Sequence, residues 1–324
     1  MKLLFAPFRL LALLAVAVVI AFGLAVPGHA EITTPLVSAG WVKEHLKDPN
    51  VFVLDIRPAA DGAGVYQKGH IPGAIHGDYD KAGWRVERGG VPFLLPTVPE
   101  LEKLIGELGI DEDTHVVVVP AGQNYSDFGA GARIYWTLKV AGLSKVSILD
   151  GGYAGWIAEQ NAVETGPSKP SPKIFTAALN KALMAEAVDV QKIEQSGGAT
   201  LIDSRPATFF AGKQKSPASK AYGRIPGAVN VDSATFYDEG TNRLKPQAQL
   251  AAIASALPGG PAVAYCNTGH WAATDWFVLS ELLGRPDVKL YYGSMVDWTS
   301  DASRPLASNR TKWDDLKKAL GLGT

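Results

Sequence analysis

The chain has very little cysteine: its 324 residues include one, Cys266. A single cysteine cannot form a disulfide within the chain, and a thioredoxin-type redox site needs a second, resolving cysteine. A disulfide-stabilised fold and dithiol redox chemistry are therefore excluded. Cys266 is either a buried, inert thiol or a reactive one, and its surroundings must decide between the two.

The chain also has almost no excess charge. Its 31 Lys and Arg residues nearly balance 32 Asp and Glu residues, which gives a formal net charge of −1. A surface that binds nucleic acid usually shows as a strong basic imbalance, so no nucleic-acid partner is expected. The sequence contains no metal-ligand spacing and no phosphate-binding glycine loop. It therefore predicts neither a metal ion nor another cofactor.

Long apolar runs are confined to the N-terminus. Lys2 and Arg9 precede an apolar stretch over residues 10–26. Gly28-His29-Ala30 follows it and places small residues at the positions that a signal peptidase recognises. This layout is typical of a secretory signal, although the stretch is just long enough to anchor the chain in a thin bilayer. We expect residues 1–30 to be removed and the protein to be periplasmic or secreted. It would contact a membrane only if this segment is not cleaved.

The rest of the chain repeats one set of motifs in the same order. The first half contains "VFVLDIRP" (51–58), "GHIPGA" (69–74), "HVVVVPAG" (115–122) and "VSILDGGYAGW" (146–156). The second half contains "ATLIDSRP" (199–206), "GRIPGA" (223–228), "AVAYCNTG" (262–269) and "VKLYYGSMVDW" (288–298). A fixed order of motifs at slightly different spacings indicates a duplicated domain with loop insertions.

In each half, short apolar runs alternate with helical patterns, which predicts an α/β domain built on a doubly wound parallel sheet. The Pro-, Ser- and Lys-rich stretch 164–173 is typical of a linker. We therefore predict an N-terminal domain over 31–163 that lacks cysteine and a C-terminal domain over 174–324. The segment 313–323 has the pattern of an amphipathic helix. Two domains that face each other need no partner subunit, so a monomer is expected.

Cys266 lies where a buried strand passes into a helix that should begin near Ala272. Ligands of open α/β sheets sit beyond the carboxyl ends of the strands. Backbone N–H groups in a tight turn before a helix can converge on an anion, and their field favours a thiolate. Gly269 can supply the positive φ that such a turn requires. The position favours a reactive cysteine.

Several enzyme classes place a thiolate in such a turn. A phosphatase or an arsenate reductase closes the turn with an arginine, but Trp271 and Ala272 stand there and the next arginine is Arg285. A cysteine hydrolase needs an oriented base. His270 is close in sequence, which does not show that its ring faces the sulfur. Sulfur transfer through a persulfide needs one cysteine alone and fits best.

These motifs resemble the tandem-domain rhodanese family, the thiosulfate and 3-mercaptopyruvate sulfurtransferases, over about residues 35 to 300. The resemblance implies two rhodanese-type domains, of which only the C-terminal one is catalytic, and an active site that faces the cleft between them. It implies that a Cys266 persulfide passes sulfane sulfur from thiosulfate or 3-mercaptopyruvate to a thiophilic acceptor. Cyanide, a thiol and an acceptor protein are the candidate acceptors.

The loop departs from the family pattern, and this leaves the donor open. Thiosulfate-specific loops usually carry Arg and Lys after the cysteine, and mercaptopyruvate-specific loops a Gly-Ser-Gly-type run. Phe209 stands where these enzymes often place a further arginine. A sulfur carrier or redox-sensing partner protein without rapid turnover is the alternative function. The candidate donor-binding residues of the loop are Asn267, Thr268, Gly269, His270 and Trp271.

Other residues are expected to support the site. Asp203 and Arg205 are candidates, with Arg205 more simply explained as an ion pair that fixes the end of a strand. Thr268 is expected either to donate its hydroxyl to the transferred sulfur or to cap the helix. Trp156 and Trp298 stand at matching repeat positions and are expected in the core.

The first half is expected to act as a scaffold. Pro120 stands there in the position of Cys266, and the residues after it, 121–133, are expected to form a longer loop without a thiol. This half would wall the cleft and contribute contacts to the active site.

Overall fold

The computed structural model describes residues 34–58, 65–167, 169–311 and 313. The predicted signal segment 1–30 and the expected helix after Trp313 lie outside the described residues. Within the described ranges, no helix combines the length and the apolar character that crossing a membrane would require.

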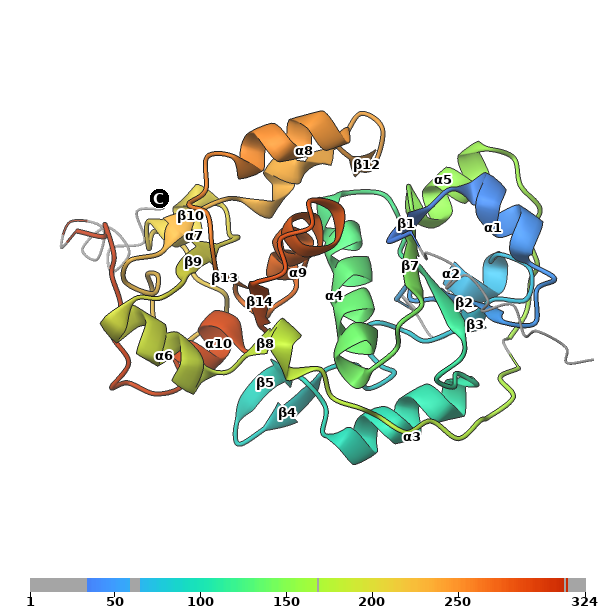
Figure 1. Ribbon diagram of the computed structural model, residues 1–324, viewed down its shortest axis with the longest axis horizontal. Helices are drawn as coiled ribbons and strands as arrows, with labels where there is room; N and C mark the ends of the chain where they lie inside the picture. Colours follow the sequence, from blue (N-terminus) through green and yellow to red (C-terminus); the bar gives the residue numbers. More distant parts are fainter. Residues whose placement is uncertain (1–33, 59–64, 168, 312, 314–324) are drawn as a thin grey trace, which may run out of the picture. The chain divides into compact units, whose positions relative to one another are not determined.

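The N-terminal half forms a five-stranded parallel sheet with the order β1-β7-β6-β2-β3 (Figure 1). Its strands are β1 (Leu36–Val37), β2 (Val51–Asp55), β3 (Ile75–His76), β6 (His115–Val119) and β7 (Val146–Leu149). The helices of this half are α1 (Ala39–His45), α2 (Val65–Lys68), α3 (Val98–Leu108), α4 (Tyr125–Ala141) and α5 (Gly152–Ala158). Every residue of β6 and β7 is buried, as expected for parallel strands covered on both faces.

The C-terminal half repeats this arrangement with the order β10-β9-β13-β14-β8. Its strands are β8 (Met184–Ala185), β9 (Thr200–Asp203), β10 (Val229–Asn230), β13 (Ala262–Tyr265) and β14 (Val288–Tyr291). Its helices are η1 (Lys181–Leu183), α6 (Ala187–Ser196), α7 (Ala207–Phe210), η2 (Ser233–Phe236), α8 (Gln247–Ala254), α9 (Trp271–Trp276), its π-helical continuation η3 (Phe277–Leu282) and α10 (Ser294–Trp298). The predicted architecture, a doubly wound α/β unit present twice, is confirmed.

Each half also carries a short antiparallel hairpin after its third parallel strand. In the N-terminal half this is β4 (Val86–Arg88) with β5 (Val91–Leu94), and in the C-terminal half β11 (Tyr237–Asp238) with β12 (Arg243–Leu244).

The two sheets bury both of their faces. Val117 and Val119 of β6 belong to a core confined to the N-terminal half, and Val263 and Tyr265 of β13 to one confined to the C-terminal half. The alternate residues of the same strands point the other way, into one large core that contains residues of both halves. The described residues of both halves accordingly form one compact unit.

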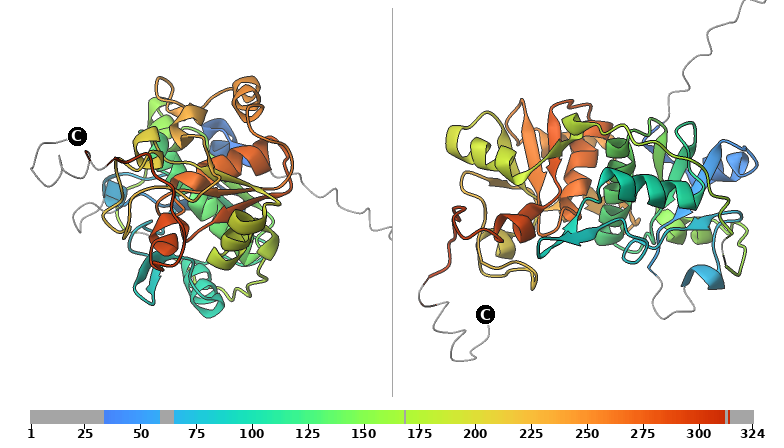
Figure 2. Two further views of the ribbon diagram at one scale, coloured as in Figure 1. Left: turned by 90° about the vertical axis from the view of Figure 1, so that its left-hand side faces the viewer. Right: turned by 90° about the horizontal axis from the view of Figure 1, so that it is seen from below.

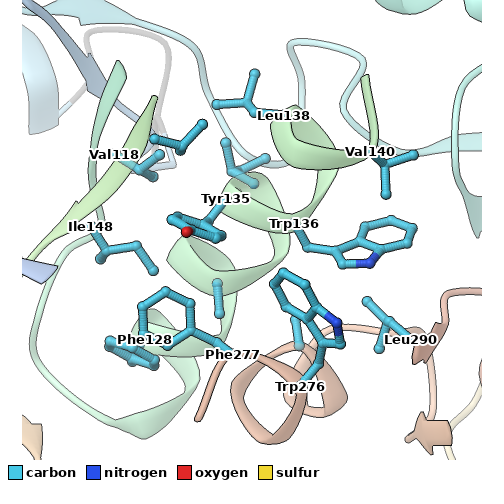
Figure 3. Packing of buried hydrophobic residues seen from close by; sticks show 14 of the residues in the cluster. Val118, Phe128, Tyr135, Trp136, Leu138, Val140, Ile148, Trp276, Phe277 and Leu290 are labelled. Carbon is cyan, nitrogen blue, oxygen red and sulfur yellow. The ribbon is translucent and has the colours of Figure 1, made fainter. Parts of the chain in front are cut away.

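Helices α4 and α9 lie side by side in the middle of this shared core (Figures 1 and 2). Figure 3 shows aromatic rings from both helices in contact there. The ring of Phe277 meets those of Phe128 and Tyr135 edge to face, with centroids 5.6 and 4.9 Å apart. Trp276 packs against Tyr135 at 6.2 Å. Aromatic pairs stabilise a contact beyond the burial of apolar area alone, so these pairs stabilise the packing of the two halves against each other.

The expected core positions of the two matching tryptophans are confirmed. Trp156 and Trp298 are buried, and their indole N–H groups donate to the carbonyl oxygens of Ala162 at 2.8 Å and Pro305 at 2.9 Å.

The longer loop expected after Pro120 is wrong. Helix α4 already begins at Tyr125, because the side chain of Asn124 accepts hydrogen bonds from the N–H groups of Ser126 at 2.9 Å and Asp127 at 3.0 Å. The turn therefore runs from 120 to 124, and the turn that contains Cys266 runs from 266 to 270 before α9 begins. The two turns have the same length.

Candidate active site

Cys266 directly follows β13, at the carboxyl edge of the C-terminal sheet. Its N–H donates to Ser294 Oγ at 3.0 Å, and its carbonyl oxygen accepts from the N–H of Met295 at 3.1 Å. Ser294 itself has a φ of 50° and donates its hydroxyl to the carbonyl oxygen of Tyr291 at 2.9 Å. The backbone of the cysteine is therefore held by the turn after β14. Helix α9 begins at Trp271, one residue before the expected start.

Cys266 is only 1% exposed, but it lines a cavity of about 200 Å³ between the two halves. One wall comes from α4 of the N-terminal half and the others from the C-terminal half. Among the described residues, no Asp, Glu, Lys or Arg lines this cavity. The lining residues are Ser126, Ser216, Cys266, Asn267, Thr268, His270 and Trp271.

The loop after Cys266 keeps its backbone N–H groups available. Within the described part of the chain, the N–H groups of residues 267–270 have no hydrogen-bond acceptor. Buried N–H groups of folded proteins are nearly always paired, so several free ones in a single turn indicate a place for an anion. No group of three or more His, Cys, Asp and Glu residues is positioned to hold a metal ion in the described ranges.

The loop carbonyls are held by a buried side chain of the N-terminal half, Arg133 of α4. Its Nη1 donates to the carbonyl oxygens of Thr268 at 3.2 Å and Gly269 at 3.0 Å. Gly269 has a φ of 72°, and a Cβ there would fall on Arg133 Nη1 and 2.5 Å from the carbonyl oxygen of Tyr292. Gly269 is predicted to bind the donor; it is not among the residues that line the cavity, and its conformation keeps the loop close to Arg133.

Both ring nitrogens of His270 bond to the N-terminal half. Nδ1 lies 2.6 Å from the hydroxyl of Tyr79, and Nε2 lies 2.9 Å from Ser126 Oγ. Burial, reinforced by the charge of Arg85, lowers the pKa of His270 to about 3. The imidazole is therefore neutral at physiological pH with both nitrogens engaged. It is not placed as the base of a cysteine hydrolase.

Thr268 and Trp271 form the remaining wall beside the sulfur. The N-cap position of α9 is His270, so Thr268 does not cap this helix and is left to line the cavity. The indole N–H of Trp271 donates to Ser126 Oγ at 3.2 Å. Phe209 packs its ring edge to face against Trp271, with centroids 6.1 Å apart. Phe209 therefore adds an apolar ring to this wall.

Asp203 and Arg205 lie under the loop and outside the cavity. Arg205 donates from Nε to Asp203 Oδ1 at 2.8 Å and from Nη2 to Asp203 Oδ2 at 2.6 Å. Arg57 binds Asp55 in the same way, with its Nη2 2.6 Å from Oδ2, in the half that has no cysteine. The motif is thus a structural ion pair in both halves. Arg205 differs by reaching Asn267 Oδ1 at 3.5 Å.

Two buried guanidinium groups, those of Arg133 and Arg205, donate hydrogen bonds to the loop that carries Cys266. Burial lowers the pKa of Arg133 to about 10. Burial also lowers the pKa of Arg205, but its bonds to Asp203 outweigh this and raise it. Both guanidinium groups therefore keep their positive charge at neutral pH, in contact with the loop that carries Cys266.

Five residues of this site were not predicted from the sequence: Tyr79, Ser126, Arg133, Ser216 and Ser294. The run Gly-Ala-Gly-Ala at 129–132 could have indicated the close contact of α4 with the loop, since small residues on a helix allow another backbone to approach closely. A Cβ on Gly129 would lie 3.2 Å from His270 Nε2. The hydroxyl residues carry no local pattern that marks them.

Comparison with known proteins agrees with this geometry. The family model for the rhodanese-like domain matches residues 38–159 and again 186–301. The chain is 33% identical over 284 residues to a 3-mercaptopyruvate sulfurtransferase of Escherichia coli, an alignment that covers 85% of this chain and 98% of that protein. It is 32% identical to a thiosulfate sulfurtransferase of Rattus norvegicus, covering 83% and 93%.

Solved structures give the same result. The crystal structure of SseA from Escherichia coli, described as a 3-mercaptopyruvate sulfotransferase with the rhodanese fold, superposes with a TM-score of 0.70 at 33% identity and covers 81% of this chain and 99% of that one. An anaerobic ergothioneine biosynthesis enzyme from Chlorobium limicola shares the fold, with a TM-score of 0.74 at 22% identity, and covers 86% of this chain and 71% of that one.

Proposed function

The chain belongs to the rhodanese family of sulfurtransferases, and we propose that it moves sulfane sulfur from a small donor to a thiophilic acceptor through a persulfide on Cys266. The observation that carries this proposal is the pairing of the chain's one thiol with a turn whose N–H groups have no acceptor among the described residues. A single nucleophilic sulfur and a preformed anion site are the two things that sulfur transfer requires.

The first half-reaction consumes the donor. The Cys266 thiolate attacks the outer sulfur of the donor, an S–S bond forms, and the bond between that sulfur and the rest of the donor breaks. Thiosulfate then leaves as sulfite, whereas 3-mercaptopyruvate leaves as the enolate of pyruvate and takes up a proton. The N–H groups of residues 267–270 hold the negative charge on the sulfur during this step.

The second half-reaction removes the sulfur. A thiophile such as cyanide or a thiolate attacks the outer sulfur of the persulfide, and the electron pair of the broken S–S bond returns to Cys266 as thiolate. An acceptor protein is a further candidate for this step. The thiol ends in its starting state, so the cycle needs neither an added oxidant nor a cofactor.

The uncharged cavity favours a donor with a single negative charge. Thiosulfate carries two charges and 3-mercaptopyruvate one, and a second charge taken out of water needs a partner that this lining does not provide. Phe209 against Trp271 closes the wall with an apolar ring. We expect Cys266 to load from 3-mercaptopyruvate at lower donor concentration than from thiosulfate.

The test is the intact mass of the protein after incubation with each donor in turn. The proposal predicts a gain of one sulfur, roughly 32 Da, that cyanide removes and that a Cys266→Ser variant does not show. Ser keeps the shape of the side chain but removes the thiolate, so its fold should persist. A mass gain retained in that variant, or absent from the native protein with both donors, contradicts the proposal.

The same uncharged lining supports a second candidate, a sulfur carrier or redox-sensing partner protein that holds a persulfide without rapid turnover. Without a cationic side chain in the cavity, the leaving group depends on uncharged donors, the backbone N–H groups and the hydroxyl groups of the lining. A carrier would load one sulfur per chain but transfer it slowly in the steady state. Comparing the loaded fraction with the steady-state rate for several acceptors separates the two.

We further propose that the protein acts in the periplasm or outside the cell as a monomer, after cleavage behind Ala30. The order of basic, apolar and small residues in 1–30 supports export. A cavity completed by two halves of one chain supports the monomer. An N-terminus at Glu31 and a light-scattering mass of one chain are expected. An intact Met1 in the membrane fraction would indicate an anchor instead.

A further inference from the structure

Arg133 combines full burial with a position between the two halves. Its side chain is 0% exposed in the middle of α4, and its pKa is lowered to about 10 by burial, so the guanidinium remains charged at neutral pH. Among the described residues it makes no ion pair with a carboxylate. A buried charge without such a partner costs free energy unless its hydrogen bonds compensate. The hydrogen bonds of Arg133 therefore have to provide this compensation.

These contacts are backbone carbonyl oxygens of the active-site turn and its neighbours. Beyond the bonds to Thr268 and Gly269, Nη1 reaches the carbonyl oxygen of Tyr292 at 3.4 Å and Nη2 that of Phe93 at 3.4 Å. A planar guanidinium with fixed N–H directions holds several acceptors in one geometry, which a lysine cannot do.

Holding these carbonyls fixes the opposite side of the loop. In a planar trans peptide the C=O and the following N–H point in opposite directions. The carbonyl groups of Thr268 and Gly269 point toward Arg133, so the N–H groups of Gly269 and His270 point away from it. These are two of the N–H groups without acceptors on which the proposed chemistry relies.

We propose that Arg133 is a positioning residue for sulfur transfer: from the half that has no thiol, it sets the direction of the N–H groups of Gly269 and His270 and holds a positive charge against the loop that carries Cys266. The inference rests on the proposed function for its purpose. Its geometry and its effect on the thiolate can be measured without any turnover. Arg133 acts through the loop and does not line the cavity.

The experiment measures the rate of Cys266 alkylation by iodoacetamide from pH 5 to 10, together with steady-state turnover, in the full chain. Arg133→Met removes the charge and the hydrogen bonds. Its alkylation midpoint should rise by about one pH unit, which makes the rate about tenfold lower below the midpoint. Turnover should fall by at least the same factor.

Arg133→Lys separates charge from positioning. The ammonium keeps the positive charge but cannot bond both loop carbonyls in the same fork. We expect an alkylation midpoint close to that of the native protein and a turnover about tenfold lower. A lysine variant with native turnover, or a methionine variant with a native alkylation profile, overturns the proposal.

Tyr135→Phe is the matched control. Tyr135 lies on the same helix, is buried, and donates its hydroxyl to Glu281 Oε2 of the other half at 2.6 Å. Within the described chain it makes no hydrogen bond or ring contact with residues 266–270. Tyr135→Phe should lower the free energy of unfolding but leave the alkylation midpoint of Cys266 and the steady-state turnover unchanged. If Arg133→Met does not fold, Arg133→Lys and this control still decide the question. If the native protein forms no persulfide, the proposed function fails, whereas the alkylation profiles still report on Arg133.

Discussion

The turn after β6 and the turn after β13 occupy the same place in two sheets of the same strand order. The strand register makes them equivalent residue by residue, because Asp55 pairs with Val119 in one sheet and Asp203 pairs with Tyr265 in the other. Pro120 and Cys266 are the next residues. The two turns also have equal length before their helices begin.

They differ at one N–H group, because in the described chain the N–H groups of residues 121, 122 and 124 have no acceptor, like those of residues 267–270. In the first turn the N–H of Gln123 donates to a carboxylate oxygen of Asp127 at 2.8 Å. Gly269 holds the equivalent position in the second turn, and within the described chain its N–H has no acceptor. One geometry thus holds an anion of its own chain in the first half and is open to a negatively charged sulfur in the second. The thiol is only part of the difference between the two turns.

The largest expected effect comes from breaking the second turn at Gly269. Gly269→Ala must adopt a φ of 72°, which costs about 1–2 kcal/mol for a residue with a Cβ, and the added atom falls against Arg133 and Tyr292. Turnover should drop at least about tenfold in a steady-state assay with cyanide as acceptor. Gln123→Ala, at the equivalent position of the first turn, keeps its backbone bond and should leave turnover unchanged. Native turnover in Gly269→Ala would mean that the loop conformation is not needed.

A smaller effect is expected from His270, which links the second turn to the N-terminal half. Its pKa of about 3 in the folded protein lies below the value of about 6.5 of an unfolded chain. The unfolded state therefore binds the proton first, and stability that is present above about pH 6.5 is lost as the pH falls toward 3. His270→Gln, which keeps a donor and an acceptor, should show a smaller loss in the free energy of urea unfolding between pH 7 and pH 4.5. Equal losses in both proteins would contradict the assignment.

The smallest effect is expected from a variant that tests whether a thiol alone distinguishes the second turn from the first. Moving the thiol into the first turn, as Pro120→Cys in a Cys266→Ser background, should produce no sulfur loading by intact mass, because Asp127 already occupies the N–H at Gln123. The control is the same background without Pro120→Cys. A gain of roughly 32 Da in the double variant would show that a thiol at this edge of a sheet is sufficient.

Much of the fold follows from local patterns in the sequence. Alternating apolar runs and helical periodicity predicted the duplicated α/β architecture, and the strand-to-helix position of Cys266 predicted a reactive turn. The start of α4 is harder to predict, because the sequence of residues 121–133 is also compatible with a longer loop and only the structure shows that Asn124 caps the helix. The contacts that hold Gly269 could not be predicted, because they come from Arg133 of the other half and from the backbone of Tyr292, which lies beyond the next strand.

The sequence by itself determined which residue is the candidate nucleophile, since the chain has one cysteine. It also determined which strands and helices surround this residue, since periodicity is a local property. The tertiary structure alone decided what holds the nucleophile's loop. Arg133 lies 136 residues before Gly269, and Tyr79 lies 191 residues before His270. Contacts at such separations arise only when two sheets bury their inner faces in one core, and no local pattern encodes which side chains then meet.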